Sequence, residues 1–262
     1  MSLKVHVCGA RGSFPTYGKE YDIYGQDTSC YVIRDGSYAI ILDCGSGLAG
    51  AAGLLAGCKK IDVLLSHIHY DHILGLFELP PVFGEAEVGF YGAFDAWIST
   101  EKGWHGQESL FRIEDLTGGR IHPVNMNTTY EMTNGFRVGF TPSSHGDDTA
   151  MIDIRKDGKR ICFTGDYEHC DTSDIGLWAR GCDLLMFDGS YTQDNYQLFQ
   201  GWGHSRWEDG CRIAKENGIR QLLIVHHAPQ SDDRMLAAYE RKSWEIFERT
   251  IFAKQGREYR VE

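Results

Sequence analysis

Short segments rich in β-branched and aromatic residues recur along the chain between Gly, Asp and Asn residues, which is the pattern of strands joined by turns. This pattern predicts strands over residues 3–8, 30–34, 38–42, 61–66, 87–91, 136–141, 149–155, 160–164, 183–187 and 221–225. The segments Arg34-Asp35-Gly36-Ser37 and Lys156-Asp157-Gly158-Lys159 separate neighbouring strands and indicate tight hairpin turns.

Helices are predicted over residues 73–79, 172–179, 206–217 and 232–252. In the third, Trp207, Cys211 and Ala214 recur at spacings of four and three, as one apolar face requires, and Asn217-Gly218 ends the helix. The fourth is expected to pack on the sheets through apolar residues at helical spacing, namely Trp244, Phe247 and Ile251.

The order of these elements predicts the fold class. Strands come first and strand–helix alternation follows, in both halves of the chain. Two sheets packed face to face with helices outside would satisfy this order, so we expect an α+β sandwich. No low-complexity linker and no strong internal repeat interrupts the chain, and we therefore expect residues 1–262 to form a single domain.

Composition narrows the class of protein. The 262 residues include 26 Lys and Arg against 37 Asp and Glu, a net charge of −11, which argues against wrapping duplex nucleic acid by charge. No apolar stretch approaches the ~18 residues of a membrane span, and the start does not resemble a signal peptide. The eight cysteines are scattered without a CxxC pair, which indicates reduced thiols and a cytoplasmic protein.

The densest chemical signal is His67-Ile68-His69-Tyr70-Asp71-His72, directly after a predicted apolar strand. In an extended chain residues two apart point to the same side, so His67 and His69 can converge on one ion. Asp71 and His72 fall where the chain turns towards a helix and can face a second point nearby. Imidazole and carboxylate ligands suit Zn, Fe or Mn, and we expect a metal site here.

Further candidate ligands follow other predicted strands. His145 comes after the strand ending at residue 141, the pair Gly165-Asp166 after that ending at 164, and the pair His226-His227 after that ending at 225. An isolated histidine at a strand end is usually structural. Several strand ends with polar groups can, however, assemble one pocket together with the first cluster.

The pattern HxHxDH, with the later His145, Gly165-Asp166 and His226, resembles the metallo-β-lactamase-fold hydrolases, and the resemblance covers nearly the whole chain. It implies a four-layer αββα sandwich that holds two divalent metal ions at one edge. By motif match the first ion would be bound by His67, His69 and His145. The second would be bound by Asp71, His72 and His226, with Asp166 bridging both and His227 as the alternative to His226. True lactamases have a Cys in place of Asp166, which disfavours antibiotic hydrolysis.

Other segments are similar to the phosphodiesterase branch of that family, which includes ribonuclease Z and cyclic-phosphate phosphodiesterases. Gly203-His204-Ser205 looks like a motif whose His contacts the scissile phosphate, and Asp188 stands where ribonuclease Z has a Glu that orients this His. The resemblance therefore implies catalytic roles for His204 and Asp188, with Ser205 near the substrate. Because Asp is shorter than Glu, the pairing of Asp188 with His204 is an open point. Arg11, in a Gly-flanked loop, is either a phosphate clamp or an exposed loop charge.

The resemblance also implies a mechanism. Two cations about 3.5–4 Å apart could share a hydroxide that attacks a small, possibly cyclic, phosphodiester. Asp71 could accept a proton, and protonated His204 could stabilise the transition state or protonate the leaving oxygen. The alternatives are a tRNA 3′-processing nuclease, a carboxyester, thioester or lactone hydrolase, and a non-catalytic metal-binding protein. We expect the protein to act on a small-molecule substrate and to form a homodimer. We do not expect it to bind a membrane or extended nucleic acid.

Overall fold

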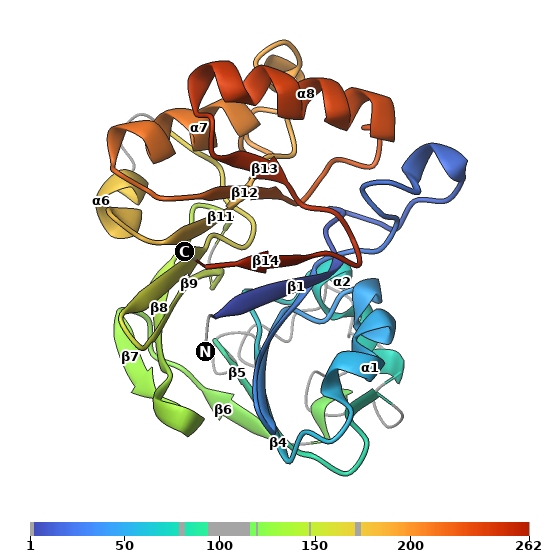
Figure 1. Cartoon of the computed structure of the whole chain (residues 1–262), viewed down its shortest axis with the longest axis vertical. Coiled ribbons are helices and arrows are strands. Elements are labelled where there is room, and N and C mark those ends of the chain that lie inside the picture. Colours follow the sequence, from blue (N-terminus) through green and yellow to red (C-terminus); the bar gives the residue numbers. More distant parts are fainter. Residues whose placement is uncertain are drawn as a thin grey trace.

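The computed structural model describes residues 3–78, 82–93, 116–118, 120–146, 148–170 and 174–261. In this part of the chain two seven-stranded mixed sheets pack face to face, with helices on both outer faces (Figure 1). The predicted αββα sandwich is therefore confirmed.

The first sheet has the strand order β14-β1-β2-β3-β4-β5-β6. Its strands are β1 (Lys4–Gly9), β2 (Cys30–Asp35), β3 (Tyr38–Leu42), β4 (Lys60–Leu64), β5 (Glu87–Gly92), β6 (Ile121–Pro123) and β14 (Glu258–Arg260). The first and last strands of the described chain, β1 and β14, pair antiparallel at the edge of this sheet.

The second sheet has the order β13-β12-β11-β10-β9-β8-β7. Its strands are β7 (Thr128–Glu131), β8 (Arg137–Pro142), β9 (Ala150–Lys156), β10 (Lys159–Phe163), β11 (Leu184–Asp188), β12 (Leu222–Val225) and β13 (Thr250–Phe252).

Helices cover the outer face of each sheet (Figure 1). On the first sheet lie α1 (Ala52–Leu55), α2 (Tyr70–Ile73) and the 3-10 helices η2 (Ser46–Ala51) and η3 (Leu74–Glu78). On the second lie α6 (Ile175–Ala179), α7 (Trp207–Glu216) and α8 (Asp233–Ile246). Short 3-10 helices also occur at η1 (Lys19–Tyr21), η5 (Thr133–Gly135) and η6 (Tyr196–Leu198).

Alternation along the central strands explains the layers. In β3, Tyr38, Ile40 and Leu42 enter the core between the sheets, whereas Ala39 and Ile41 enter the core under α1 and η2. Likewise in β11 alternate residues face the inter-sheet core and the core under α7 and α8. Since successive side chains of a strand point to opposite faces, a strand apolar at every position requires cover on both sides.

Both predicted hairpins are formed. Asp35 pairs with Tyr38, and Lys156 pairs with Lys159, so each loop has two residues. Asp157 and Gly158 have φ values of 50° and 77°, as a turn of type I′ requires, and the Asp-Gly pair tolerates this conformation.

The predicted helix over 232–252 is wrong at its C-terminal end. α8 ends at Ile246, Phe247 is extended, and Thr250–Phe252 instead form β13, which pairs parallel with β12. Phe247 packs at the edge of the outer core, but Trp244 is half exposed, so the expected apolar face is not continuous. Of the predicted helix 172–179, residues 172 and 173 lie outside the described residues and α6 covers 175–179.

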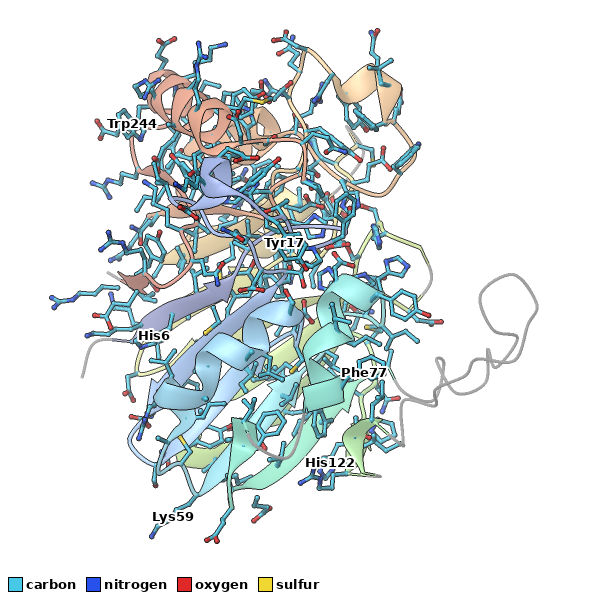
Figure 2. The ribbon with its side chains drawn as sticks, turned by 90° about the vertical axis from the view of Figure 1, so that its right-hand side faces the viewer. His6, Tyr17, Lys59, Phe77, His122 and Trp244 are labelled. Carbon is cyan, nitrogen blue, oxygen red and sulfur yellow. The ribbon has the colours of Figure 1, made fainter. Side chains whose placement is uncertain are left out.

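Figure 2 shows the molecule turned by 90°, with Trp244 of α8 near one end, Lys59 at the opposite end and Tyr17 between them. No helix among the described residues is long and apolar enough to cross a membrane.

Candidate metal centre

The HxHxDH segment lies where the chain leaves β4 and enters α2. β4 ends at Leu64, and His69 still has an extended backbone (φ −64°, ψ 150°), so His67 and His69 sit two apart on an extended segment. Helix α2 begins at Tyr70, which places Asp71 and His72 in its first turn. The change from extended to helical backbone therefore divides the four candidate ligands into two pairs.

The second sheet supplies the remaining candidates from the C-terminal ends of three strands. His145 follows β8, Asp166 follows β10 and His226 follows β12 directly. His226 has a left-handed backbone (φ 57°), a conformation that non-glycine residues seldom adopt. The predicted convergence of separate strand ends on one place is thus present in the structure.

Three groups of candidate ligand atoms overlap among the described residues, and the atoms within each group lie within 4.8 Å of one another. The third group joins Asp188 and His204 to Asp166 and His226, and the other two correspond to the two expected ions. One consists of His67, His69, His145 and Asp166, and the other of Asp71, His72, Asp166 and His226. Asp166 belongs to both groups: its Oδ1 lies 3.0 Å from Nε2 of His72 and its Oδ2 lies 3.5 Å from Nε2 of His67. The grouping is the one that the family resemblance implies.

Neighbouring groups orient three of the imidazoles, those of His67, His72 and His145, so that one nitrogen of each is available to a cation. Nδ1 of His72 donates to Oδ2 of Asp43 at 2.7 Å, and Nδ1 of His145 donates to the carbonyl oxygen of Gly203 at 2.7 Å. Nδ1 of His67 lies 3.0 Å from Oγ of Ser66, which itself donates to Asp43. With Nδ1 occupied, Nε2 of each ring carries the lone pair that faces the cluster, as metal-binding histidines require.

The cluster also leaves buried polar atoms without hydrogen-bond partners. Nε2 of His72 and Oδ1 of Asp166 are both buried and lie 3.0 Å apart, but neither has a hydrogen-bond partner of acceptable geometry among the described residues. A buried polar atom without a partner is strongly destabilising, but a divalent cation would satisfy both atoms at once. The imidazole and carboxylate donors therefore fit one or two ions of the Zn, Fe or Mn type.

Electrostatics favour the protonation states that a cation needs at His67, His69 and Asp166, whereas at His72 burial is outweighed by the facing carboxylates, which raise the pKa. Burial, followed by the neighbouring His72, lowers the pKa of His67 to about 3, and burial with His145 lowers the pKa of His69 to about 4. Burial opposes ionisation of Asp166, but the facing imidazoles outweigh burial and hold the pKa of Asp166 well below its usual range. Neutral imidazoles beside an ionised carboxylate are the metal-binding forms of these groups.

His204 and Asp188 adjoin the two clusters. Nδ1 of His204 lies 2.8 Å from Oδ2 of Asp188 and 4.0 Å from Oδ2 of Asp166. Burial alone would lower the pKa of His204, but Asp188, its hydrogen-bond partner, leads the carboxylates that raise it to about 9. The pairing of Asp188 with His204 is formed although Asp is shorter than Glu.

Asp71 joins the second group to the N-terminal loop. Its Oδ2 lies 3.1 Å from Nε2 of His226 and accepts a hydrogen bond from the backbone N–H of Ser13 at 2.7 Å. Gly12 immediately precedes this contact, and a Cβ at Gly12 would lie 2.3 Å from Nδ1 of the His226 ring. The N-terminal loop therefore packs directly against the candidate ligands.

Arg11 does not take the role that the sequence suggested, and it is not an exposed loop charge either. It is 1% exposed, and its guanidinium donates to the carbonyl oxygens of Gly25, Ala228 and Ser231. Nε and Nη1 donate to these backbone groups inside the protein, and Nη2 is buried without a hydrogen-bond partner among the described residues, so the structure does not support a phosphate clamp at Arg11. Its neighbour in the β-bridge, His227, is also turned away from the ligand groups, since its Nε2 donates to the carbonyl oxygen of Ala253.

Ser205 is likewise a structural residue. It is fully buried, its Oγ donates to the carbonyl oxygen of Tyr167, and it accepts from the backbone N–H of His169 at 2.9 Å. Its hydroxyl has no remaining proton to offer a substrate, so the expected substrate contact is wrong.

Three residues important for this geometry were given no role from the sequence. Ser66 and Ser190 orient His67 and His226, and Glu168 binds the loop that precedes His204. Ser66 and Ser190 stand beside recognised motif residues and could have been suspected. Glu168 has no local signal, because its partners lie about 30 residues further along the chain.

Residues 38–227 match the Beta-lactamase superfamily domain. The probable metallo-hydrolase YhfI of Bacillus subtilis (strain 168) is 26% identical over 230 residues, which cover 86% of this chain and 86% of YhfI. Its crystal structure has a TM-score of 0.77 at 23% identity and covers 99% of this chain and 100% of that chain.

Two other solved structures share the fold. Zn(2+)-bound PqqB from Methylobacterium extorquens has a TM-score of 0.75 at 16% identity and covers 98% of this chain and 99% of its own. A diphosphatase from the PhnP family has a TM-score of 0.71 at 17% identity and covers 99% of this chain and 98% of its own. The superfamily domain spans well over half of the sequence, and the chain therefore belongs to the metallo-β-lactamase superfamily.

Proposed function

We propose that the protein is a metal-dependent hydrolase with two divalent ions, and that it is a phosphodiesterase acting on a small phosphodiester, with linear and cyclic phosphodiesters as the candidate substrates. The observation that carries this proposal is the place of the His204–Asp188 pair, directly beside two ligand groups that share Asp166. A cationic imidazole held next to two metal positions suits a substrate with an anionic oxygen at the reacting centre.

The ligands would divide as the geometry groups them. His67, His69 and His145 would hold one ion, Asp71, His72 and His226 the other, and Asp166 would contact both. Ions at these positions would polarise phosphoryl oxygens and lower the pKa of water. Zn, Mn and Fe all suit the donor set, and PqqB is a relative of the same fold that has been seen with zinc.

His204 would act on the leaving side of the phosphodiester. Asp188 holds Nδ1, so Nε2 remains as the proton donor, and Asp188 favours the protonated form of the ring. A proton given to the leaving oxygen, or hydrogen-bonded to a phosphoryl oxygen, would stabilise the charge that develops there. Asp71 would receive a proton from the attacking water, because its Oδ2 already lies among the ligand atoms of the second group.

Two further observations favour a small phosphodiester over other substrates. The PhnP-family diphosphatase has the same fold, and a phosphoanhydride is close in chemistry to a phosphodiester. The net charge of −11 disfavours the long polyanionic backbone of tRNA. We also propose that the chain is a single domain and works in the cytoplasm. Its partners would be a small-molecule substrate and, in a homodimer, a second copy of the chain. No disulfide joins any of its eight cysteines, all of which lie in the described part of the chain.

The test is hydrolysis of bis(p-nitrophenyl) phosphate by protein that is stripped of metal and reconstituted with Mn²⁺ or Zn²⁺. We expect turnover that requires the metal and disappears in Asp166→Ala, with Glu216→Ala, an exposed position on α7, as the control. Two bound metals without phosphodiester turnover would reject the proposal. A parallel panel of carboxyesters, thioesters and lactones would then identify the alternative hydrolase, and inactivity on every substrate would leave a metal-binding role.

A further inference from the structure

The loop between β11 and α7 ends against the candidate metal centre. Its residues Leu198 and Trp202 are 77% and 66% exposed, so little apolar burial holds this part of the loop in place. Nevertheless the following residue, Gly203, supplies the carbonyl oxygen that accepts from Nδ1 of His145 at 2.7 Å. Since His204 comes next, the position of this loop determines the surroundings of two residues of the site.

The carboxylate of Glu168 binds this loop at three points. Oε1 accepts from the Tyr196 hydroxyl at 2.7 Å and from the backbone N–H of Gly201 at 2.6 Å. Oε2 accepts from the backbone N–H of Gly203 at 2.9 Å. Both carboxylate oxygens are therefore used, and all three donors come from the last eight residues before His204.

Gly203 connects Glu168 to His145 through one residue. Its N–H donates to Glu168 and its carbonyl accepts from His145, so a displacement at one end is passed to the other. The contact is close, because a Cβ at Gly203 would lie 2.2 Å from Nδ1 of His145, and its φ of +88° also favours glycine.

Glu168 is also joined to the other side of His145. The hydroxyl of Ser144, the residue before His145, donates to the backbone carbonyl oxygen of Glu168. The neighbouring hydroxyl of Ser143 donates in the same way to the carbonyl oxygen of Asp166. The main chain of Glu168 thus contacts the segment that carries His145. The side chain of Glu168 contacts Gly203, whose carbonyl oxygen accepts the hydrogen bond from His145.

We propose that Glu168 is a positioning residue of the metal centre, which sets the orientation of the His145 ring and the place of His204 by holding the 196–203 loop. It contacts neither ring in any of the interactions above, and its effect passes through Gly203. This inference extends the proposed function, because it assigns a determinant of the first ligand group. The positioning of His145 can be tested with metal alone, without any substrate.

The variant is Glu168→Gln, which keeps the size of the side chain but replaces one acceptor oxygen by an NH₂ donor. The amide cannot accept from all three loop donors, so at least one backbone N–H loses its partner. Glu245→Gln, at an exposed position on α8, is the matched control. Co²⁺ is the probe, because its d–d absorption reports the geometry of its ligands.

We expect Glu168→Gln to change the absorption of the Co²⁺ held by the group of His67, His69 and His145. Binding of this ion should weaken by about 10- to 100-fold, as is typical when the group that orients a ligand is lost. Glu245→Gln should match the wild type. Tyr196→Phe removes the donor furthest in sequence from Gly203 and should change the spectrum less than Glu168→Gln does. Where the wild type hydrolyses the phosphodiester, kcat of Glu168→Gln should fall more than KM rises.

A Co²⁺ spectrum and affinity equal to the wild type, with only a lower melting temperature, would overturn the inference and leave Glu168 as a structural support of the loop. Failure of the proposed function gives a different result, because wild-type protein inactive on phosphodiesters would still show the altered Co²⁺ spectrum in Glu168→Gln.

Discussion

Asp188 and His204 form a hydrogen-bonded pair, with Oδ2 of the carboxylate 2.8 Å from Nδ1 of the imidazole. The other oxygen of Asp188 lies 2.8 Å from the hydroxyl of Ser190, which in turn lies 2.9 Å from Nδ1 of His226. One buried carboxylate therefore orients the proposed acid directly and a proposed metal ligand through a serine. Asp188 thereby links the proposed acid to the second ligand group.

Replacement of His204 separates catalysis from metal binding. We expect His204→Ala to lower kcat by about 10²- to 10⁴-fold, the usual contribution of a general acid, with metal content unchanged. Metal content is measured by elemental analysis of the purified variant. Loss of an ion together with activity would instead make His204 a ligand.

The adjacent histidines His226 and His227 should respond differently. His226→Ala should lose the second metal ion, because Nε2 of His226 lies 3.0 Å from Oδ1 of Asp166. His227→Ala should keep both ions and lower the melting temperature, since its buried ring packs on Phe252 and donates to the carbonyl of Ala253. Metal analysis of the two variants side by side decides which histidine is the ligand. Loss of an ion in His227→Ala but not in His226→Ala would assign the ligand to His227.

A methyl group at Gly12 should disturb the second ligand group. Its Cβ would lie 2.3 Å from the His226 ring, so Gly12→Ala must displace either the loop or the ligand. We expect the affinity for the second metal ion to fall by about tenfold, measured by competition with a chelator. Gly53→Ala is the control, since a Cβ there meets nothing within 4 Å, and alanine in helix α1 should be neutral or stabilising. Equal metal binding in both variants would show that the loop can move aside.

Arg11 should matter for stability and not for substrate binding. Arg11→Met removes charged hydrogen bonds to three backbone carbonyls. The carbonyl of Ala228 keeps the N–H of Ser231 as a donor, whereas the buried carbonyls of Gly25 and Ser231 lose the guanidinium. We expect the free energy of unfolding to fall by about 2–4 kcal/mol, measured by urea titration, while KM of the folded enzyme is unchanged. A raised KM with unchanged stability would restore the phosphate-clamp interpretation.

The two ions should leave in a definite order as pH falls. The pKa values of His67 and His69, lowered mainly by burial, are about 3 and 4, so protons compete weakly for the first group above pH 5. Burial opposes protonation of His72 as well, but the facing Asp166, Asp71 and Asp43 outweigh it and raise its pKa, so a cation in the second group must displace a proton. Acidification should therefore release the second ion first. The Co²⁺ absorption of each group is identified by comparison with Asp71→Ala, which lacks a ligand of the second group, and His69→Ala, which lacks a ligand of the first. A pH titration of the Co²⁺-loaded protein then shows which absorption disappears first.

The central strands, and the grouping of the candidate ligands, could be predicted because their signals are local. Strand β3 has the predicted bounds, since an apolar run flanked by turn residues admits few alternatives. His67, His69, Asp71 and His72 occupy six consecutive residues, and their spacing already places them around the end of β4. The short strands β6, β7, β13 and β14 were not predicted, because three or four residues carry too little pattern and depend on their neighbours in the sheet.

The errors concern side chains whose environment comes from distant parts of the chain. Arg11 lies in a sequence that reads as an exposed loop, but Ala228 and Ser231 from the C-terminal region enclose it. Ser205 follows a motif histidine, yet its partners belong to the segment after Asp166. Neither environment is encoded within a window of neighbouring residues, so burial could not be assigned before the fold was known.

Each ligand group takes residues from both sheets: His67 and His69 leave β4 of the first, whereas His145 and Asp166 follow β8 and β10 of the second. An ion in such a place would tie the two halves of the sandwich across their seam. Hinge opening between the halves would then break metal–ligand bonds, which makes this motion too expensive for each catalytic cycle. Entry and exit of a substrate would then have to occur without separation of the two sheets.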